Sequence, residues 1–253
     1  MEYILLIVIA FGASMLTFFS GFGLGTLLTP VFIIFLPPEL AVAATAVVHF
    51  LNNLFKLTLI GKHIHWKLIL KFGIPALAGA FVGARLLAFL AGSDKNITLG
   101  IFETTQLNVV LGMLILVFAL FELLPKLKAI QIKEKYLITG GALSGFFGGL
   151  SGHQGALRSA FLIKLGLSKE SFIATGVMIA CIIDSMRIGT YFLTFDIAVI
   201  QSQWSLLALA TISAFVGALI GKNLLKKVTI GLLQNLVGIL MIIISILLFL
   251  GRI

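Results

Sequence analysis

The stretch SGFFGGLSGHQGALRSAFL, residues 144–162, joins a glycine cluster to polar side chains within one of the most apolar regions of the chain. Glycine lets a backbone turn or unwind, and unwound backbone at membrane depth is tolerated only beside protein or water. Polar side chains are costly in such surroundings unless they are paired or functional. The stretch therefore predicts a helix that breaks inside a membrane and continues as a short, polar segment.

The composition of the whole chain is that of a membrane protein. Of the 253 residues, 60% are hydrophobic and 11% are charged, and the mean hydropathy is +1.19. A soluble domain carries about 25% charged residues. The net charge of +9 fits basic loops held on the cytoplasmic side and gives no reason to expect nucleic acid as a partner. The expected fold class is an all-α polytopic membrane protein with the lipid bilayer as its surroundings.

Ten apolar segments follow one another along the chain. They cover residues 3–20, 22–36, 39–60, 67–90, 105–124, 136–150, 153–166, 170–193, 203–221 and 229–250. The second and the seventh have only about 15 residues, which as helix rise ~22 Å and fall short of the ~30 Å hydrocarbon core. Each of these two follows a glycine cluster, SGFGLG at 20–25 and SGFFGGLSG at 144–152. We therefore expect one short, broken segment in each half.

The two halves are related as a repeat. The matching positions are Gly25 with Gly155 and Thr45 with Thr175, each 130 residues apart, and AFVGA at 80–84 with AFVGA at 214–218. Five segments per half place the second half in the membrane in the opposite sense. We therefore expect two inverted-topology repeats, at 1–125 and 136–253, joined by a basic cytoplasmic linker at 126–135.

The loop charges support this arrangement. The loops GKHIHWK (61–67) and GKNLLKK (221–227) and the linker KLKAIQIKEK (126–135) are basic, whereas TFDIAVIQSQ (194–203) has no lysine or arginine and GSDKNITLGIFETT (91–104) is nearly neutral. Because lysine and arginine are retained on the cytoplasmic side, the three basic stretches should lie there and both termini outside.

Polar side chains in three apolar segments fall at helical spacing, which puts those of one segment on a shared face. Ionisable groups inside a membrane are candidates for function. The members are His49, Asn52, Asn53 and Lys56 in the third segment, Gln154 and Arg158 in the seventh, and Asp184, Arg187 and Tyr191 in the eighth.

Each candidate also has a structural explanation. Lys56 lies about one turn from a cytoplasmic end, so its amine could extend to the surface. Asp184 and Arg187 could form a structural i, i+3 ion pair, and Asn52 and Asn53 could hydrogen-bond neighbouring helices. His153 fits a structural role as well as a ligand contact, and His63 and His65 are expected to be solvated. Two GxxxG pairs, Gly79 with Gly83 and Gly217 with Gly221, are typical of close helix packing.

Two motifs resemble those of other functions and are set aside. GFGLG (21–25) follows no strand and lacks the spacing of a dinucleotide fingerprint. GLSG (149–152) resembles the nucleophile motif of intramembrane serine proteases, but Ser151 needs a base within reach, and His153 is too close in sequence to be well placed. Cys181 is the single cysteine, so we expect no disulfide, no metal site and no cofactor.

The remaining pattern is positive charge, amide groups and glycine-rich helix starts that converge from both halves. Helix N-termini carry about +0.5 charge with free N–H donors, and arginine adds a forked donor set that fits an oxyanion. We therefore predict that these groups replace the water around a small anionic substrate. The predicted substrate-binding residues are His49, Asn52, Asn53, Lys56, Ser151, Gly152, His153, Gln154, Arg158 and Arg187, and Asp184 is assigned to proton coupling or charge pairing.

The same stretches carry a family resemblance over nearly the whole chain. GFGLGTLLTPVFIIFLPPELAVAATA (21–46), GKHIHWKLILKFGIPALAGAFVGARL (61–86) and GGLSGHQGALRSAFLIKLGLSKESFIATG (148–176) resemble the sulfite/organosulfonate exporter family TauE/SafE. The first glycine cluster is less dense than is typical of that family. The resemblance implies export of a sulfur-containing oxyanion, such as sulfite or sulfoacetate, across the bacterial inner membrane.

The expected function is therefore a transporter, not an enzyme, that exports a small sulfur-containing oxyanion or organosulfonate. An anion channel or a permease for another small organic anion is the alternative, and an intramembrane hydrolase is the third. A channel would show no saturation and no counterflow, and a hydrolase would require Ser151. The sequence does not define the oligomeric state.

The loop charges make a prediction about topology. Cysteines introduced as Lys95→Cys and Lys128→Cys, in a background that lacks Cys181, should react with a membrane-impermeant thiol reagent from opposite sides, because one stretch is neutral and the other basic. Lys95→Cys should react from outside. Labelling of both cysteines from the same side would contradict the inverted repeat.

Overall fold

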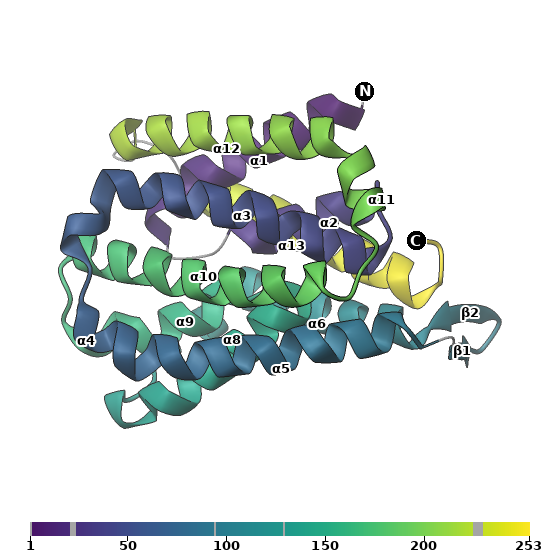
Figure 1. Ribbon diagram of the computed structural model, residues 1–253, viewed down its shortest axis with the longest axis horizontal. Helices are drawn as coiled ribbons and strands as arrows, with labels where there is room; N and C mark the ends of the chain where they lie inside the picture. Colours follow the sequence, from purple (N-terminus) through teal and green to yellow (C-terminus); the bar gives the residue numbers. More distant parts are fainter. Residues whose placement is uncertain (1, 21–23, 94, 129, 225–229) are drawn as a thin grey trace.

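Each of the ten apolar segments forms a helix, because a bilayer offers no partner for free backbone N–H and C=O groups and a helix pairs them internally. The computed structural model describes residues 2–20, 24–93, 95–128, 130–224 and 230–253. Most helices run along the long axis of the molecule (Figure 1). The protein is an all-α polytopic membrane protein. Within the described residues, the runs long and apolar enough to cross a membrane are Pro38–His63, Trp66–Ala91, Gln106–Leu123, Lys169–Phe192 and Trp204–Lys222.

The first half contains five of the ten segments. They are α1 (Glu2–Ser20), α2 (Leu24–Ile33), α3 (Pro38–Ile60), a continuous run of α4 (Trp66–Leu68), the π-helical turn η2 (Ile69–Gly73) and α5 (Ile74–Ala91), and α6 (Gln106–Leu123). A 3₁₀ turn, η1 (Gly61–His63), follows α3. The short α7 (Pro125–Lys128) and η3 (Glu134–Tyr136) lie in the linker region.

The second half repeats this order. It consists of α8 (Leu137–Ser151), α9 (Gly155–Leu162) with the 3₁₀ turn η4 (Ile163–Leu165), α10 (Lys169–Phe192), the short α11 (Ile197–Ser202), α12 (Trp204–Leu224) and α13 (Ile230–Phe249). The sequence-predicted order of long, short, long, long, long segments is therefore present in both halves.

A two-stranded hairpin replaces the loop expected at 91–104. Strand β1 (Asn96–Leu99) pairs antiparallel with β2 (Phe102–Thr105). Ile97 and the threonines of both strands have branched side chains that favour extended backbone, and Gly100 supplies the positive φ of +67° at the turn. The all-α expectation missed this element because each strand has only four residues.

The two short segments are shorter than the sequence suggested. Helix α2 has 10 residues and α9 has 8, which correspond to rises of ~15 Å and ~12 Å, so neither crosses the ~30 Å hydrocarbon core. All residues of α2 are buried. Helix α2 is therefore enclosed by protein. The glycines at 21 and 23 in the first cluster lie outside the described residues.

Helices pack mainly across the two halves. The most extensive pairs are α1 with α12, α5 with α8, α6 with α13 and α3 with α10. In the repeat, α1 corresponds to α8, α5 to α12, α3 to α10 and α6 to α13. The α1–α12 pair of one half-to-half contact is therefore repeated as α8–α5, whereas α6–α13 and α3–α10 each pair a helix with its own counterpart. Helices α3 and α10 run antiparallel (Figure 1), since His49 meets Asp184 while the backbone N–H of His65, just beyond α3, bonds Oγ1 of Thr175. The opposite sense of the halves in the membrane remains a prediction.

Glycines allow two of these pairs to approach closely. A Cβ added at Gly79 or Gly83 of α5 would collide with backbone of α8, and one added at Gly217 or Gly221 of α12 would collide with backbone of α1. The two GxxxG pairs are thus confirmed as packing faces.

The two ends of the bundle differ. The 61–71 region and the linker meet at one end, where Lys71 pairs with Glu134 at 3.7 Å. At the other end the hairpin region holds the C-terminus, because Oγ1 of Thr104 donates to the O of Leu248. Both termini lie toward that second end (Figure 1). Of the basic loop at 221–227, residues 225–227 lie outside the described part.

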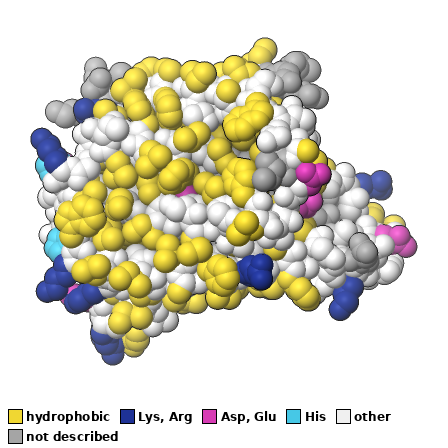
Figure 2. Space-filling model, viewed as in Figure 1, with side chains coloured by type: hydrophobic (Ala, Val, Ile, Leu, Met, Phe, Trp, Pro, Cys, Tyr) yellow, Lys and Arg dark blue, Asp and Glu magenta, His cyan; other side chains and the backbone are white. Residues whose placement is uncertain are grey.

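The flank between the ends is apolar. Figure 2 shows hydrophobic side chains spread over this face, with histidine and many of the lysine and arginine side chains at its left margin and other charged side chains toward the right. Strongly exposed apolar side chains include Leu70, Phe89, Met113 and Ile212. Such a surface fits lipid contact.

The glycine packing makes a prediction about stability. Gly145 of α8 faces α5 so closely that a Cβ would collide with the backbone oxygen of Ala76. Gly145→Ala should destabilise the protein by about 3 kcal/mol, because overpacking forces the backbones apart. Gly189→Ala on α10 is the matched control, since nothing lies within 4 Å of the added Cβ. Thermal unfolding in detergent should separate the two variants; equal melting temperatures would contradict this account of the α5–α8 interface.

Candidate anion-binding site

A cluster of polar side chains is buried between α3, α10 and the break that separates α8 from α9. In the break, Gly152 adopts a φ of +83° and α9 begins at Gly155. All the sequence-predicted site residues are buried: His49, Asn52, Asn53, Lys56, Ser151, Gly152, His153, Gln154, Arg158, Asp184 and Arg187.

Asp184 is the centre of this cluster. Its Oδ2 accepts a hydrogen bond from Nδ1 of His49 at 2.6 Å. Its Oδ1 accepts from Nε2 of Gln154 at 3.1 Å and from Nε of Arg187 at 2.9 Å. Because a carboxylate only accepts, Nδ1 of His49 carries the hydrogen, and Nε2 is left facing Nδ2 of Asn53 at 3.3 Å. Donors from α3, the break and α10 thus converge on one carboxylate.

Two further cations adjoin this network. Nη1 of Arg158 donates to Oε1 of Gln154 at 3.2 Å, so Gln154 connects Arg158 with Asp184. Lys56 is 3% exposed and lies near enough to Arg158 to interact with it electrostatically. This burial contradicts the alternative in which the amine of Lys56 extends to the surface. In formal charge, the cations Lys56, Arg158 and Arg187 outnumber the carboxylate Asp184.

Glycines bring the start of α2 against the break in the second half. A Cβ on Gly25 would lie 3.1 Å from the backbone oxygen of Gly152. A Cβ on Gly152 would lie 3.2 Å from both Nη1 of Arg187 and Oγ1 of Thr29, and the positive φ of Gly152 disfavours any side chain there. The start of α2, the second-half break and the head of Arg187 are therefore in direct contact.

Two serines that the sequence analysis did not select belong to the same surroundings. Oγ of Ser14 on α1 donates to Oδ1 of Asn52 at 3.1 Å, and Oγ of Ser144 on α8 donates to the O of Gln154 at 3.2 Å. Both serines are fully buried and stand 130 residues apart, the offset of Gly25 and Gly155. The repeat offset is the signal that could have identified them.

Several buried polar atoms have no hydrogen-bond partner among the described residues. They are Oγ1 of Thr17, Oγ1 of Thr45, Nδ2 of Asn52, Nε2 of His153 and Nη2 of Arg187. Nη2 of Arg187 lies 2.9 Å from Oδ1 of Asp184, but Nε makes the aligned bond. An unsatisfied buried donor costs about 1–3 kcal/mol. Donors on Asn52 and Arg187 are therefore suited to a ligand that supplies acceptor oxygens.

The start of α9 adds backbone donors. No side chain caps this end, and the first N–H groups of a helix point outward with a partial positive charge. Arg158 lies one turn further along the same helix. The backbone N–H groups at the start of α9 and the side chain of Arg158 thus both favour a negatively charged ligand.

The Ser151–His153 pair differs from the sequence-based expectation. The spacing predicts that His153 is too close to be well placed as a base, yet its Nδ1 lies within hydrogen-bond reach of Oγ of Ser151, at 3.1 Å. The left-handed Gly152 turns the chain so that both side chains meet. Oγ of Ser151 donates to the O of Phe147. A serine hydroxyl that donates to a backbone carbonyl is not poised to give its proton to His153.

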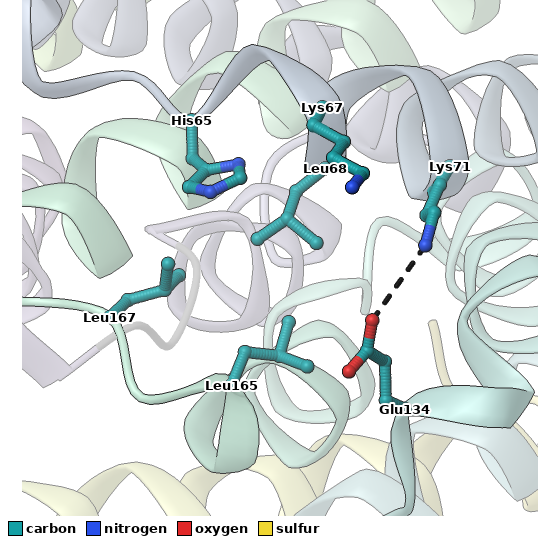
Figure 3. Close-up of a pocket in the computed structure, with 7 residues that line it drawn as sticks. All are labelled: His65, Lys67, Leu68, Lys71, Glu134, Leu165 and Leu167. Carbon is teal, nitrogen blue, oxygen red and sulfur yellow. Dashed lines mark ion pairs between the residues drawn. The ribbon is translucent and has the colours of Figure 1, made fainter.

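A separate cavity of about 210 Å³ lies at the basic end of the bundle (Figure 3). Its lining consists of His65, Lys67, Leu68, Lys71, Glu134, Leu165 and Leu167. These residues come from both halves and the linker. None of them belongs to the predicted anion site.

Comparison with known proteins gives one family. A family model described as Sulfite exporter TauE/SafE matches residues 6–248, which include both halves and every residue of the buried cluster. No curated protein and no solved structure matches the chain.

The Asp184–Arg187 contact makes a prediction that separates pairing from binding. The double variant Asp184→Asn/Arg187→Gln should fold, because it leaves no uncompensated charge at this contact. Each single variant should lose about 3–5 kcal/mol of stability, because it leaves a buried charge without its partner. If Arg187 binds the anion, the double variant should still fail to transport labelled sulfite or sulfoacetate in liposomes. Near-normal transport by the double variant would rule out a binding role for Arg187.

Proposed function

Because the chain belongs to the sulfite exporter TauE/SafE family, we propose that it exports a small sulfur-containing oxyanion or organosulfonate, of the sulfite and sulfoacetate class. The observation that carries the proposal is the gathering of buried cationic side chains at the break. Arg187 bonds Asp184 directly, Arg158 is connected to Asp184 through Gln154, and Lys56 lies beside Arg158. All four charged side chains are at most 5% exposed, and such a group of cations in a medium of low polarity favours a negatively charged ligand.

The type of donor favours an oxygen-rich anion. Arginine presents several N–H groups in one plane, which match the oxygens of a sulfonate or sulfite group. Nδ2 of Asn52 has no hydrogen-bond partner within the described residues, and Nη2 of Arg187 makes no hydrogen bond there beyond its ion pair with Oδ1 of Asp184 at 2.9 Å. Asp184 binds Nε of Arg187 and thereby orients the guanidinium, whose Nη1 makes only a long hydrogen bond of 3.4 Å to the O of Gly148 at the break. Asp184 is thus assigned to charge pairing.

The position of the cluster fits transport through the membrane. The start of α2 lies against the break that precedes α9, and transporters with repeats commonly bind substrate between broken helices near the midplane. In a bacterial inner membrane, a potential that is negative inside favours anion exit by ~2.3 kcal/mol per charge per 100 mV. Export then needs no further source of energy.

The two alternatives predict different measurements. A channel for small anions would conduct without saturation or counterflow. A hydrolase would depend on Ser151, whose contact with His153 is the one observation in its favour. Family membership and the hydrogen bond from Ser151 to the O of Phe147 favour the transporter.

The decisive experiment is counterflow in liposomes. Vesicles preloaded with unlabelled sulfite, thiosulfate, sulfoacetate or sulfate should accumulate the labelled form of a transported anion transiently above equilibrium. We expect counterflow with sulfite or sulfoacetate. If none of the four anions gives counterflow, and a thermal-unfolding measurement shows that the protein is folded, the proposal is refuted.

Arg158 should determine anion affinity. Arg158→Lys keeps the charge but loses the planar fork, so the Kd should rise about tenfold, and Arg158→Gln should raise it about 100-fold, as expected for losing bonds to a charged donor. Arg85→Gln is the matched control, because Arg85 is exposed on α5 beside Phe81. Ser151→Ala should have a mild effect. An unchanged Kd in Arg158→Gln would exclude Arg158 from the site.

A further inference from the structure

The cavity at the basic end has the chemistry of an anion site with an apolar floor. Lys67 and Lys71 point toward its interior from one helix, and Glu134 faces Lys71 from the linker (Figure 3). Leu68, Leu165 and Leu167 complete the lining. Two lysines against one carboxylate leave a net positive charge. The volume of about 210 Å³ is several times the ~30 Å³ of a water molecule, so a phosphate-sized group has room.

The ion pair inside the cavity is weak enough to be replaced. Nζ of Lys71 and Oε1 of Glu134 are 3.7 Å apart, and their side chains are 47% and 65% exposed. Exposed pairs of this kind contribute about 0–1 kcal/mol. Replacing Glu134 by an anionic ligand as the partner of Lys71 therefore costs little free energy.

The residues next to the cavity place it at the depth of lipid headgroups. Trp66 precedes Lys67 and is 62% exposed, and Tyr136 follows two residues after Glu134 and is 46% exposed. Exposed tryptophan and tyrosine at helix ends are typical of the membrane–water interface. Further along the chain, Ile74, eight residues after Trp66, and Ile138, two residues after Tyr136, are strongly exposed apolar residues, as lipid-facing positions are. The cavity thus lies between a lipid-facing flank and the basic end.

We propose that this cavity binds the phosphate of an anionic lipid headgroup, with Lys67 and Lys71 as its ligands. Basic pockets between helices on the cytoplasmic side are suited to this class of ligand. The lipid joins three parts of the chain, because the lining comes from the first half, the linker and the second half. It therefore stabilises the arrangement of the two halves. This site is independent of the proposed transport function.

The test measures thermal unfolding of the full-length protein in detergent with added lipid. Phosphatidylglycerol should raise the Tm by about 5 °C or more at saturation, and phosphatidylcholine should not, because only the first carries net negative charge. Inorganic phosphate forms a third arm that separates a lipid headgroup from a soluble anion. A rise with inorganic phosphate equal to that with phosphatidylglycerol, or no specific rise with phosphatidylglycerol, would overturn the proposal.

Variants locate the effect in the cavity. Lys67→Gln/Lys71→Gln should abolish the phosphatidylglycerol-specific rise, whereas Lys62→Gln/Lys222→Gln removes two exposed lysines outside the cavity and should retain it. Glu134→Gln should bind the lipid more tightly, because the competing carboxylate is gone. Equal rises in both double variants would indicate a general surface effect and contradict the assignment.

A second measurement does not depend on the folding of any variant. Phosphatidylglycerol that carries a photoreactive headgroup should crosslink wild-type protein within residues 65–71 or 165–167. Crosslinks confined to other segments would contradict the proposed site.

Discussion

One carboxylate holds the centre of the molecule together. Asp184 is fully buried and receives hydrogen bonds from His49 on α3, Gln154 in the break and Arg187 on its own helix. Removed from water, this charge is stable only while all three donors are in place. Since the donors come from both halves, the same bonds that compensate the charge also fix the broken helix against the antiparallel pair α3 and α10.

That convergence depends on the absence of side chains elsewhere. Gly148 precedes the break, and a Cβ there would lie 3.1 Å from Cβ of Gln154, within the space that the amide needs to reach Asp184. Gly152 leaves room for the head of Arg187 in the same way. Further out, Gly145 and Gly83 let α5 and α8 pack backbone to backbone. The glycines thus act at two scales, since they bring the helices together and they open the space in which the polar groups meet.

The sequence was sufficient for features that depend on local periodicity. Spacing alone placed His49, Asn53 and Lys56 on one face of a helix, and the apolar runs located all ten helices. It could not pair His49 with Asp184 across 135 positions, because no local period encodes which helices pack together. The Ser151–His153 contact was missed for a related reason, since it depends on the left-handed backbone of Gly152 and not on the number of residues between the two side chains.

The buried carboxylate is compatible with an anion site because a transporter must release what it binds. Three cations without a counter-charge would hold an oxyanion strongly, and the empty site would be costly in a medium of low polarity. Asp184 lowers the formal charge of the cluster from three to two. A doubly charged anion then brings the filled site to neutrality, the state in which the least uncompensated charge is buried. Under the proposed function, this arrangement favours dianions over singly charged anions of similar size.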